Sequence, residues 1–236
     1  MSFRFKQFFI EDSKCAMKVG TDGVLLGAWA ETPPRPSPQG REIRILDVGT
    51  GSGLIARMLM QRCPEAHIDA IDIDPDAAEQ ARGNGIRAFQ ARLQDWKLDI
   101  GHCYDLIVSN PPYFQNSLKN PDEGRKAARH TDTLSYAELV HHSARLLTEH
   151  GQLALILPAE AENEIRRLAA VENLFLTHVT RVNSKENKKP KRVLLAFEKL
   201  KIKNYELKIS EDTLILEDEK GGRSAAYSEL TKDFYL

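Results

Sequence analysis

Residues Ile45–Gly53 read Ile-Leu-Asp-Val-Gly-Thr-Gly-Ser-Gly, and this stretch decides the fold. Its apolar half is typical of a buried strand, and the helical pattern over 54–62 makes the glycines a strand-to-helix turn. Gly49, Gly51 and Gly53 allow a tight turn and a close approach to a ligand where a Cβ would clash. The stretch therefore predicts a nucleotide-type site at the carboxyl end of a strand in an open α/β sheet.

Apolar runs of strand length alternate with helical patterns after this turn, which indicates a parallel sheet covered on both faces. Five such strands are expected, at 43–48, 68–73, 86–91, 104–109 and 152–157. Two more, near 175–182 and 192–198, have no helix between them and predict an antiparallel hairpin at one end of the sheet. We thus expect a mostly parallel seven-stranded sheet, with residues after 200 as candidates for edge strands.

Composition and charge exclude several classes of protein. The 236 residues are 42% hydrophobic and 28% charged, which argues against disorder and coiled coil. The start lacks the apolar core of a secretory signal, and the longest apolar runs are too short to span a membrane. Cys15, Cys63 and Cys103 lie in no metal-ligand spacing, so we expect reduced thiols, no metal and a cytoplasmic protein.

The net charge of −1 hides a basic segment at residues 181–203, which has nine Lys and Arg against two Glu. It is either a solvated face or a contact surface for nucleic acid.

At the other end of the chain, a proline-rich stretch, Thr32–Pro38, separates a short N-terminal segment from the rest. Before it, Thr21 and Asp22 are expected to cap a short helix that runs through Ala30.

Two acids accompany the glycine turn. Asp47 precedes the first glycine, which suits a ligand with an ammonium group, and Asp72 falls at the tip of the next strand, where a carboxylate can accept both ribose hydroxyls. Gly51 and Gly53 also match a loose dinucleotide pattern, Gly-x-Gly-x-x-Ala. Asp72 alone does not distinguish NAD from S-adenosylmethionine.

The third motif is Ser109–Phe114, Ser-Asn-Pro-Pro-Tyr-Phe, directly after the fourth strand. Asn110 can offer its side-chain oxygen, and Pro111 its carbonyl, to the two hydrogens of one amino group. Such a site directs the lone pair of a poorly nucleophilic nitrogen and stabilises the positive charge that develops on it. Tyr113 can stack on a planar target, and Pro112 stiffens the turn. This motif has no use in hydride transfer, which disfavours a dehydrogenase.

Together the three motifs resemble those of class I S-adenosylmethionine-dependent N-methyltransferases, which have a Rossmann-like sheet. Nearly the whole chain resembles the bacterial family that N6-methylates the adenine 3′ of the anticodon in a valine tRNA. The stretches that carry this narrower resemblance are Phe3–Phe8, Met17–Trp29, Ala128–His130 and Lys189–Arg192.

The resemblance implies S-adenosylmethionine as cofactor and tRNA as partner, with a monomer favoured. The implied cofactor-binding residues are Thr21, Asp22, Asp47, Gly49, Gly51, Gly53, Asp72, Asp95 and Trp96. Those implied at the target adenine are Asn110, Pro111, Pro112 and Tyr113. Those implied to contact the rest of the substrate are Phe114, Arg129, His130, Lys188, Lys189, Lys191 and Arg192. His130 is either such a contact or a solvated loop residue, because the chemistry requires no base.

Three segments follow from the same resemblance. Residues 1–31 would close over the cofactor and the target, 39–200 would form the methyltransferase domain, and 201–236 would be a C-terminal extension. Other readings stay open: a methyltransferase for rRNA guanine N2 or protein glutamine N5, or a non-catalytic RNA-binding module on this fold. A separate N-terminal binding domain, expected for the glutamine enzymes, is absent from the 236 residues.

Overall fold

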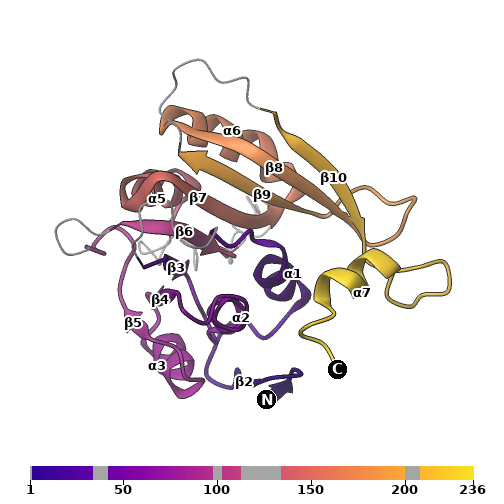
Figure 1. Ribbon diagram of the computed structural model, residues 1–236, viewed down its shortest axis with the longest axis horizontal. Helices are drawn as coiled ribbons and strands as arrows, with labels where there is room; N and C mark the ends of the chain where they lie inside the picture. Colours follow the sequence, from indigo (N-terminus) through magenta and orange to yellow (C-terminus); the bar gives the residue numbers. More distant parts are fainter. Residues whose placement is uncertain (1, 34–41, 98–102, 113–133, 200–207) are drawn as a thin grey trace, which may run out of the picture.

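A mixed sheet forms the centre of the protein, seen in a computed structural model that describes residues 2–33, 42–97, 103–112, 134–199 and 208–236 (Figure 1). Its eight strands lie in the order β10-β8-β9-β7-β6-β3-β4-β5. They are β3 (Arg44–Val48), β4 (His67–Asp72), β5 (Ala88–Gln90), β6 (Tyr104–Ser109), β7 (Leu147–Pro158), β8 (Leu174–Asn183), β9 (Arg192–Lys199) and β10 (Ser210–Ile215). Neighbouring strands are parallel except β9, which is antiparallel to both β7 and β8.

The predicted α/β sheet and the β8–β9 hairpin are therefore confirmed, and the candidates for edge strands after residue 200 supply one further strand. The hairpin is followed by β10, an eighth strand that pairs in parallel with β8 and occupies the edge of the sheet. Only Leu214 of β10 is buried, so the strand has little of the alternation that identifies strands from sequence.

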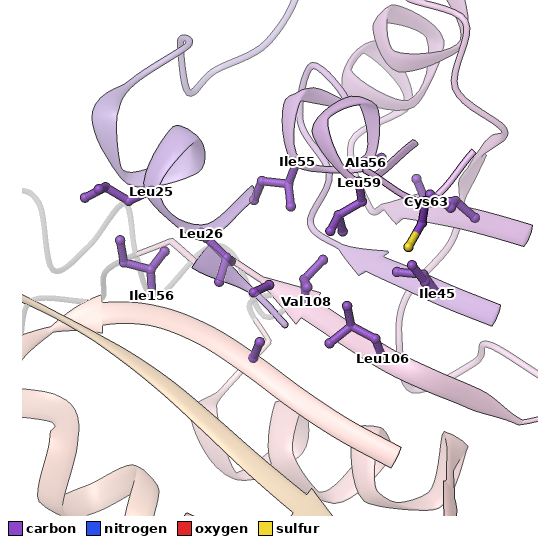
Figure 2. Close-up of a cluster of buried hydrophobic side chains, with 14 of the residues drawn as sticks. Leu25, Leu26, Ile45, Ile55, Ala56, Leu59, Cys63, Leu106, Val108 and Ile156 are labelled. Carbon is purple, nitrogen blue, oxygen red and sulfur yellow. The ribbon is translucent and has the colours of Figure 1, made fainter. Parts of the chain in front are cut away.

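Helices cover both faces of the sheet (Figure 1). The helices packed against one face are α1 (Thr21–Trp29), α2 (Leu54–Arg62), α3 (Pro75–Gly83) and α7 (Ala225–Thr231). Those on the other are α5 (Tyr136–Leu146) and α6 (Glu162–Val171), the latter after a short 3-10 turn, Ala159–Ala161. Successive residues of β3 point to opposite faces of the sheet. Ile45 faces α2, as Figure 2 shows, in the same core cluster as residues of α1, and Leu46 belongs to the core under α5 and α6.

Helix starts follow the local sequence, with one exception. Asp74 caps α3 by accepting from the Asp76 N–H at 2.9 Å, and Ser135 and Glu138 form a capping box at α5. The predicted cap of α1 is wrong, because the N-cap residue is Gly20 and makes no side-chain cap bond. Thr21 and Asp22 lie inside the first turn, where the Asp22 carboxylate bonds Arg192 instead.

The two ends of the described chain meet beneath α1 and α2 (Figure 1). Strands β1 (Ser2–Arg4) and β2 (Phe9–Glu11) form a small antiparallel hairpin that the sequence analysis did not predict. Phe5 stacks between Phe8 and Tyr235, and the Lys6 N–H donates to the Phe234 carbonyl at 2.8 Å. The N-terminal segment is thus anchored before it reaches the site.

Candidate active site

A pocket of about 640 Å³ opens at the carboxyl ends of β3, β4 and β6. It lies where the chain order reverses between β3 and β6, the point at which open α/β sheets bind ligands. Most of its walls come from five stretches of chain, Cys15–Gly23, Val48–Ser52 with Leu54 and Ile55, Ile71–Asp74, Ala91–Gln94 and Ser109–Pro112, and Ala77 and Leu134 complete them. Three of these stretches are the predicted motifs, so the fold brings them together.

The three glycines of the turn differ in what surrounds them: Gly49 and Gly51 border open space, and Gly53 packs against the protein. Gly49 and Gly51 have φ of +70° and +55°, and a Cβ on either would meet nothing within 4 Å. Gly53 also has positive φ, but a Cβ there would lie 2.7 Å from the Ile86 side chain. The first two glycines therefore leave open space along the turn, and the third lets α2 start close to the segment before β5.

Asp72 lies at the end of β4 on the pocket wall, with its carboxylate held in place by backbone donors. Its Oδ2 accepts from the Gly51 N–H at 2.8 Å, and its Oδ1 accepts from the Asp74 N–H at 3.0 Å. Burial raises the pKa of this carboxyl, and the two N–H donors oppose the rise. Each oxygen keeps a further lone pair, so the group can still accept hydroxyls of a ligand.

Asp47 lies beneath the turn rather than on the wall, and its side chain is fully buried. One oxygen accepts from the Thr50 hydroxyl at 2.7 Å and the Ala56 N–H at 3.2 Å. The other, Oδ1, is buried and has no partner among the described residues. Burial raises the pKa of Asp47 to about 7, against the lowering effect of its two donors. Asp47 thus holds the glycine turn and keeps one acceptor unused.

Asp95 and Trp96 do not reach the described walls of the pocket. The Asp95 side chain is 76% exposed, and Trp96 packs on Phe89 and donates to the Tyr104 hydroxyl at 3.1 Å. The wall after β5 is made instead by Ala91–Gln94, where Leu93 is buried. The resemblance implied Asp95 and Trp96, whereas the residues that directly follow the end of β5 are the ones that line the pocket.

Asn110 follows β6 and lines the pocket with Ser109, Pro111 and Pro112. The Ser109 hydroxyl donates to the Val48 carbonyl at 2.8 Å, which ties the end of β6 to the end of β3 and so to the glycine turn. Tyr113, Phe114, Arg129 and His130 lie outside the described residues.

Similarity to known proteins agrees with this arrangement. The family description "methyltransferase small domain" matches residues 35–188. Two curated relatives, from Phocaeicola vulgatus and Parabacteroides distasonis, are each 45% identical over 99% of this chain and 97% of their own length. Both are named tRNA1(Val) (adenine(37)-N6)-methyltransferase. This chain belongs to that family.

Solved structures show that the fold of this family member is widely shared among methyltransferases. A protein from Agrobacterium tumefaciens described as an O-methyltransferase superposes with a TM-score of 0.67 at 17% identity, over 90% of this chain and 96% of that one. A Listeria monocytogenes protein described as a class I S-adenosylmethionine-dependent methyltransferase gives 0.54 at 13% identity, over 86% and 67%. The Rossmann-like class I fold is therefore confirmed.

The predicted substrate-contact residues of the β8–β9 turn lie at the same sheet edge as the pocket. Lys188, Lys189 and Lys191 are exposed in the turn between β8 and β9, which opens at the carboxyl end of β8. Arg192, at the start of β9, bonds the Asp22 carboxylate in α1 at 2.8 Å. Thr21 and Asp22 both line the pocket, so the basic turn and the pocket wall are joined.

The loop before α1 forms a wall of the pocket that does not come from a strand end. Residues Cys15–Gly20 line the pocket, and the Lys18 ammonium donates to the carbonyls of Asp12, Ser13 and Cys15 at 2.7, 3.2 and 2.8 Å.

Across the described ranges, no helix is long and apolar enough to cross a membrane, and no three His, Cys, Asp or Glu are grouped as metal ligands would be.

Proposed function

We propose that this protein transfers a methyl group from S-adenosylmethionine to N6 of an adenine in tRNA, and that the target is adenine 37 of tRNA1(Val). The observation that carries the proposal is the position of Asn110, which faces the same pocket as the glycine turn and Asp72. Names of relatives that match over nearly the full chain support tRNA adenine rather than rRNA guanine or protein glutamine.

The described residues fit S-adenosylmethionine. The open space beside Gly49 and Gly51 would receive its methionine part, while Asp47 holds the turn from beneath and keeps its Oδ1 without a partner among the described residues. Asp72 would accept the ribose hydroxyls. Exposed Ile73 and buried Leu93, both on the wall, offer apolar contact to a planar ring. When bound, the cofactor supplies an electrophilic methyl group on a sulfonium.

Asn110 and Pro111 would act on the target nitrogen. The amide oxygen of Asn110 and the carbonyl of Pro111 would each accept one N–H of the adenine amine, which directs its lone pair into the pocket. These fixed acceptors also stabilise the positive charge that develops on nitrogen, with no rearrangement needed during the reaction. Catalysis of this kind depends mostly on orientation. The methylated nitrogen is acidic and can lose its proton to water, so no protein base is required.

The tRNA itself would lie along the carboxyl edge of the sheet. Lys188, Lys189 and Lys191 are proposed to contact phosphates, with Arg192 beside them, since cations near the backbone provide most sequence-independent affinity. Tyr113 is proposed to stack on the target base, with Phe114, Arg129 and His130 as further contacts. We propose that the protein acts as a cytoplasmic monomer and that residues 1–31 close over the site.

A nucleoside assay tests the proposal. The protein is incubated with methyl-labelled S-adenosylmethionine and total tRNA that lacks the modification, and the RNA is digested to nucleosides. Label in N6-methyladenosine, mapped to position 37 of tRNA1(Val), is the expected result. Label in methylguanosine, or no label in any tRNA at high enzyme concentration, would overturn it. Asn110→Ala serves as the control for contaminating activity.

A further inference from the structure

Met17 lies against the side chain proposed to orient the target. The Asn110 Nδ2 donates to the Met17 sulfur at 3.7 Å, within the range for a hydrogen bond to sulfur. Both residues line the pocket, and Met17 is 47% exposed although it is a large apolar side chain. A thioether at the opening of the site is therefore in direct contact with the Asn110 amide.

This contact bears on which end of the amide faces the substrate. An asparagine amide has two nearly isosteric orientations, one with the oxygen and one with the NH₂ group on a given side. Only the oxygen can accept from an amine, because the NH₂ group would direct its own hydrogens at those of the target. A thioether sulfur has no hydrogen to donate and accepts weakly, so it favours the orientation with NH₂ toward itself. That leaves Oδ1 on the other side of the amide.

Met17 is held in place by bonds that do not involve Asn110. The Lys18 ammonium donates to three backbone carbonyls of the preceding loop, and the Val19 N–H donates to an Asp12 carboxylate oxygen at 2.9 Å. The same loop is attached to α3, where the Ser13 hydroxyl donates to Gln80 at 3.2 Å. The backbone beside Met17 is thus held by hydrogen bonds, so the loop presents the Met17 side chain to the opening of the site.

We propose that Met17 is a positioning residue for methyl transfer. Its sulfur holds the Asn110 amide in the orientation that presents Oδ1 to the target amine. The inference rests on the proposed function, and it adds a specific role for the loop that precedes α1. It predicts a defect in the rate of the bound complex rather than in cofactor binding.

The first experiment compares Met17→Leu, which keeps the volume and removes the acceptor, with Met60→Leu, the same change on α2 outside the described pocket. Single-turnover rates are measured at saturating cofactor and tRNA, and S-adenosylhomocysteine affinity by calorimetry. The loss of one weak hydrogen bond predicts a rate about three- to tenfold lower for Met17→Leu, with affinity and melting temperature unchanged. Met17→Gln, whose amide can turn either an oxygen or an NH₂ group toward Asn110, should recover only part of the rate.

The second experiment removes the asymmetry of the amide. In Asn110→Asp both terminal atoms are oxygens, so the orientation no longer matters. Met17→Leu should then change the residual rate by less than about twofold. A double-mutant cycle compares this effect with the effect of Met17→Leu in the wild-type background, and the difference is the coupling between the two residues. Equal slowing in both backgrounds, a wild-type rate for Met17→Leu, or a loss confined to cofactor affinity would overturn the inference. Failure of the wild-type protein to methylate tRNA adenine would instead overturn the proposed function.

Discussion

Arg192, the first residue of β9, donates from Nε to the carboxylate of Asp22 in α1 at 2.8 Å, across 170 positions of sequence. Asp22 lines the pocket, and Arg192 directly follows the basic turn that contains Lys188, Lys189 and Lys191. The side chains of the pair are 32% and 25% exposed, so water screens it only in part. The bond therefore connects the proposed tRNA surface to the wall of the cofactor site.

Arg192→Ala should weaken cofactor binding modestly. A partly exposed ion pair contributes up to about 1 kcal/mol, so S-adenosylhomocysteine affinity should fall by about two- to fivefold with little change in melting temperature. Calorimetry on Arg192→Ala, Asp22→Ala and the double variant gives the coupling between them. Arg181→Ala is the matched control, because Arg181 lies on β8 of the same hairpin and forms its ion pairs elsewhere, with Glu162 in α6 and Glu211 in β10. Additive losses would mean that the pair does not act on the pocket.

Asp72→Ala should lower cofactor affinity far more. The substitution removes the proposed ribose acceptor and releases the Gly51 N–H from its partner, so the glycine turn loses a constraint. Loss of a charged hydrogen-bonding partner predicts about 1.5 to 3 kcal/mol, roughly ten- to a hundredfold in affinity. Titration with S-adenosylhomocysteine measures it, with exposed Asp76→Ala as control. Unchanged affinity for Asp72→Ala would place the ribose elsewhere.

The parts of the site that the sequence predicted share one physical property. The glycine turn, Asp72 and Asn110 each follow directly after an apolar strand, and the carboxyl ends of parallel strands meet at one edge of the sheet. Local order along the chain is then enough to place residues that are 20 to 60 positions apart. The start of α3 was also predictable from local sequence. Asp74 accepts from a free N–H of the first turn, and Pro75, which has no N–H, suits the first helical position.

The parts that the sequence did not predict depend on contacts between different elements or loops of the fold. Asp22 bonds Arg192 instead of capping α1, Trp96 turns inward to Tyr104, and the β1–β2 hairpin packs against the C-terminal residues. Met17 meets Asn110 across 93 positions. None of these partners lies within one helix or strand of the other, so periodicity and spacing carry no signal for them.

Replacing Lys188, Lys189 and Lys191 with Ala should weaken tRNA binding and leave cofactor affinity unchanged. If each lysine contacts a phosphate, the slope of log K against log salt should fall in magnitude by about 0.7 to 0.9 per contact. Filter binding across a salt series measures the slope. The charge-matched control replaces Arg145, Arg166 and Arg167 on α5 and α6. An equal change in both triple variants would indicate general electrostatics rather than a contact surface.

Asp47 should make the folded protein less stable as pH rises from about 4 to about 7. Burial raises its pKa from 3.8 to about 7, so over this range the folded state binds a proton that the unfolded state releases. Asp47→Asn keeps an oxygen for the bonds from Thr50 and Ala56 but cannot ionise. The stability of the wild-type protein relative to this variant should therefore fall across that range. Urea denaturation of both proteins at several pH values measures the difference, and a constant difference would show that Asp47 titrates normally.

Asn110→Ala should be the most damaging change to turnover for its size. The amide oxygen is proposed to bind the target nitrogen more strongly as positive charge develops on it, so its loss raises the barrier more than it weakens binding. Removal of one preorganised group of this kind costs about 10² to 10³ in rate. Tyr113→Ala should differ, because stacking acts equally before and during the reaction and its loss of about 1 to 3 kcal/mol falls on tRNA affinity. Single-turnover rates at saturating tRNA separate the two. A near wild-type rate for Asn110→Ala under those conditions would show that the Asn-Pro-Pro sequence is only a structural turn. The proposal that Asn110 orients the target amine would then be wrong.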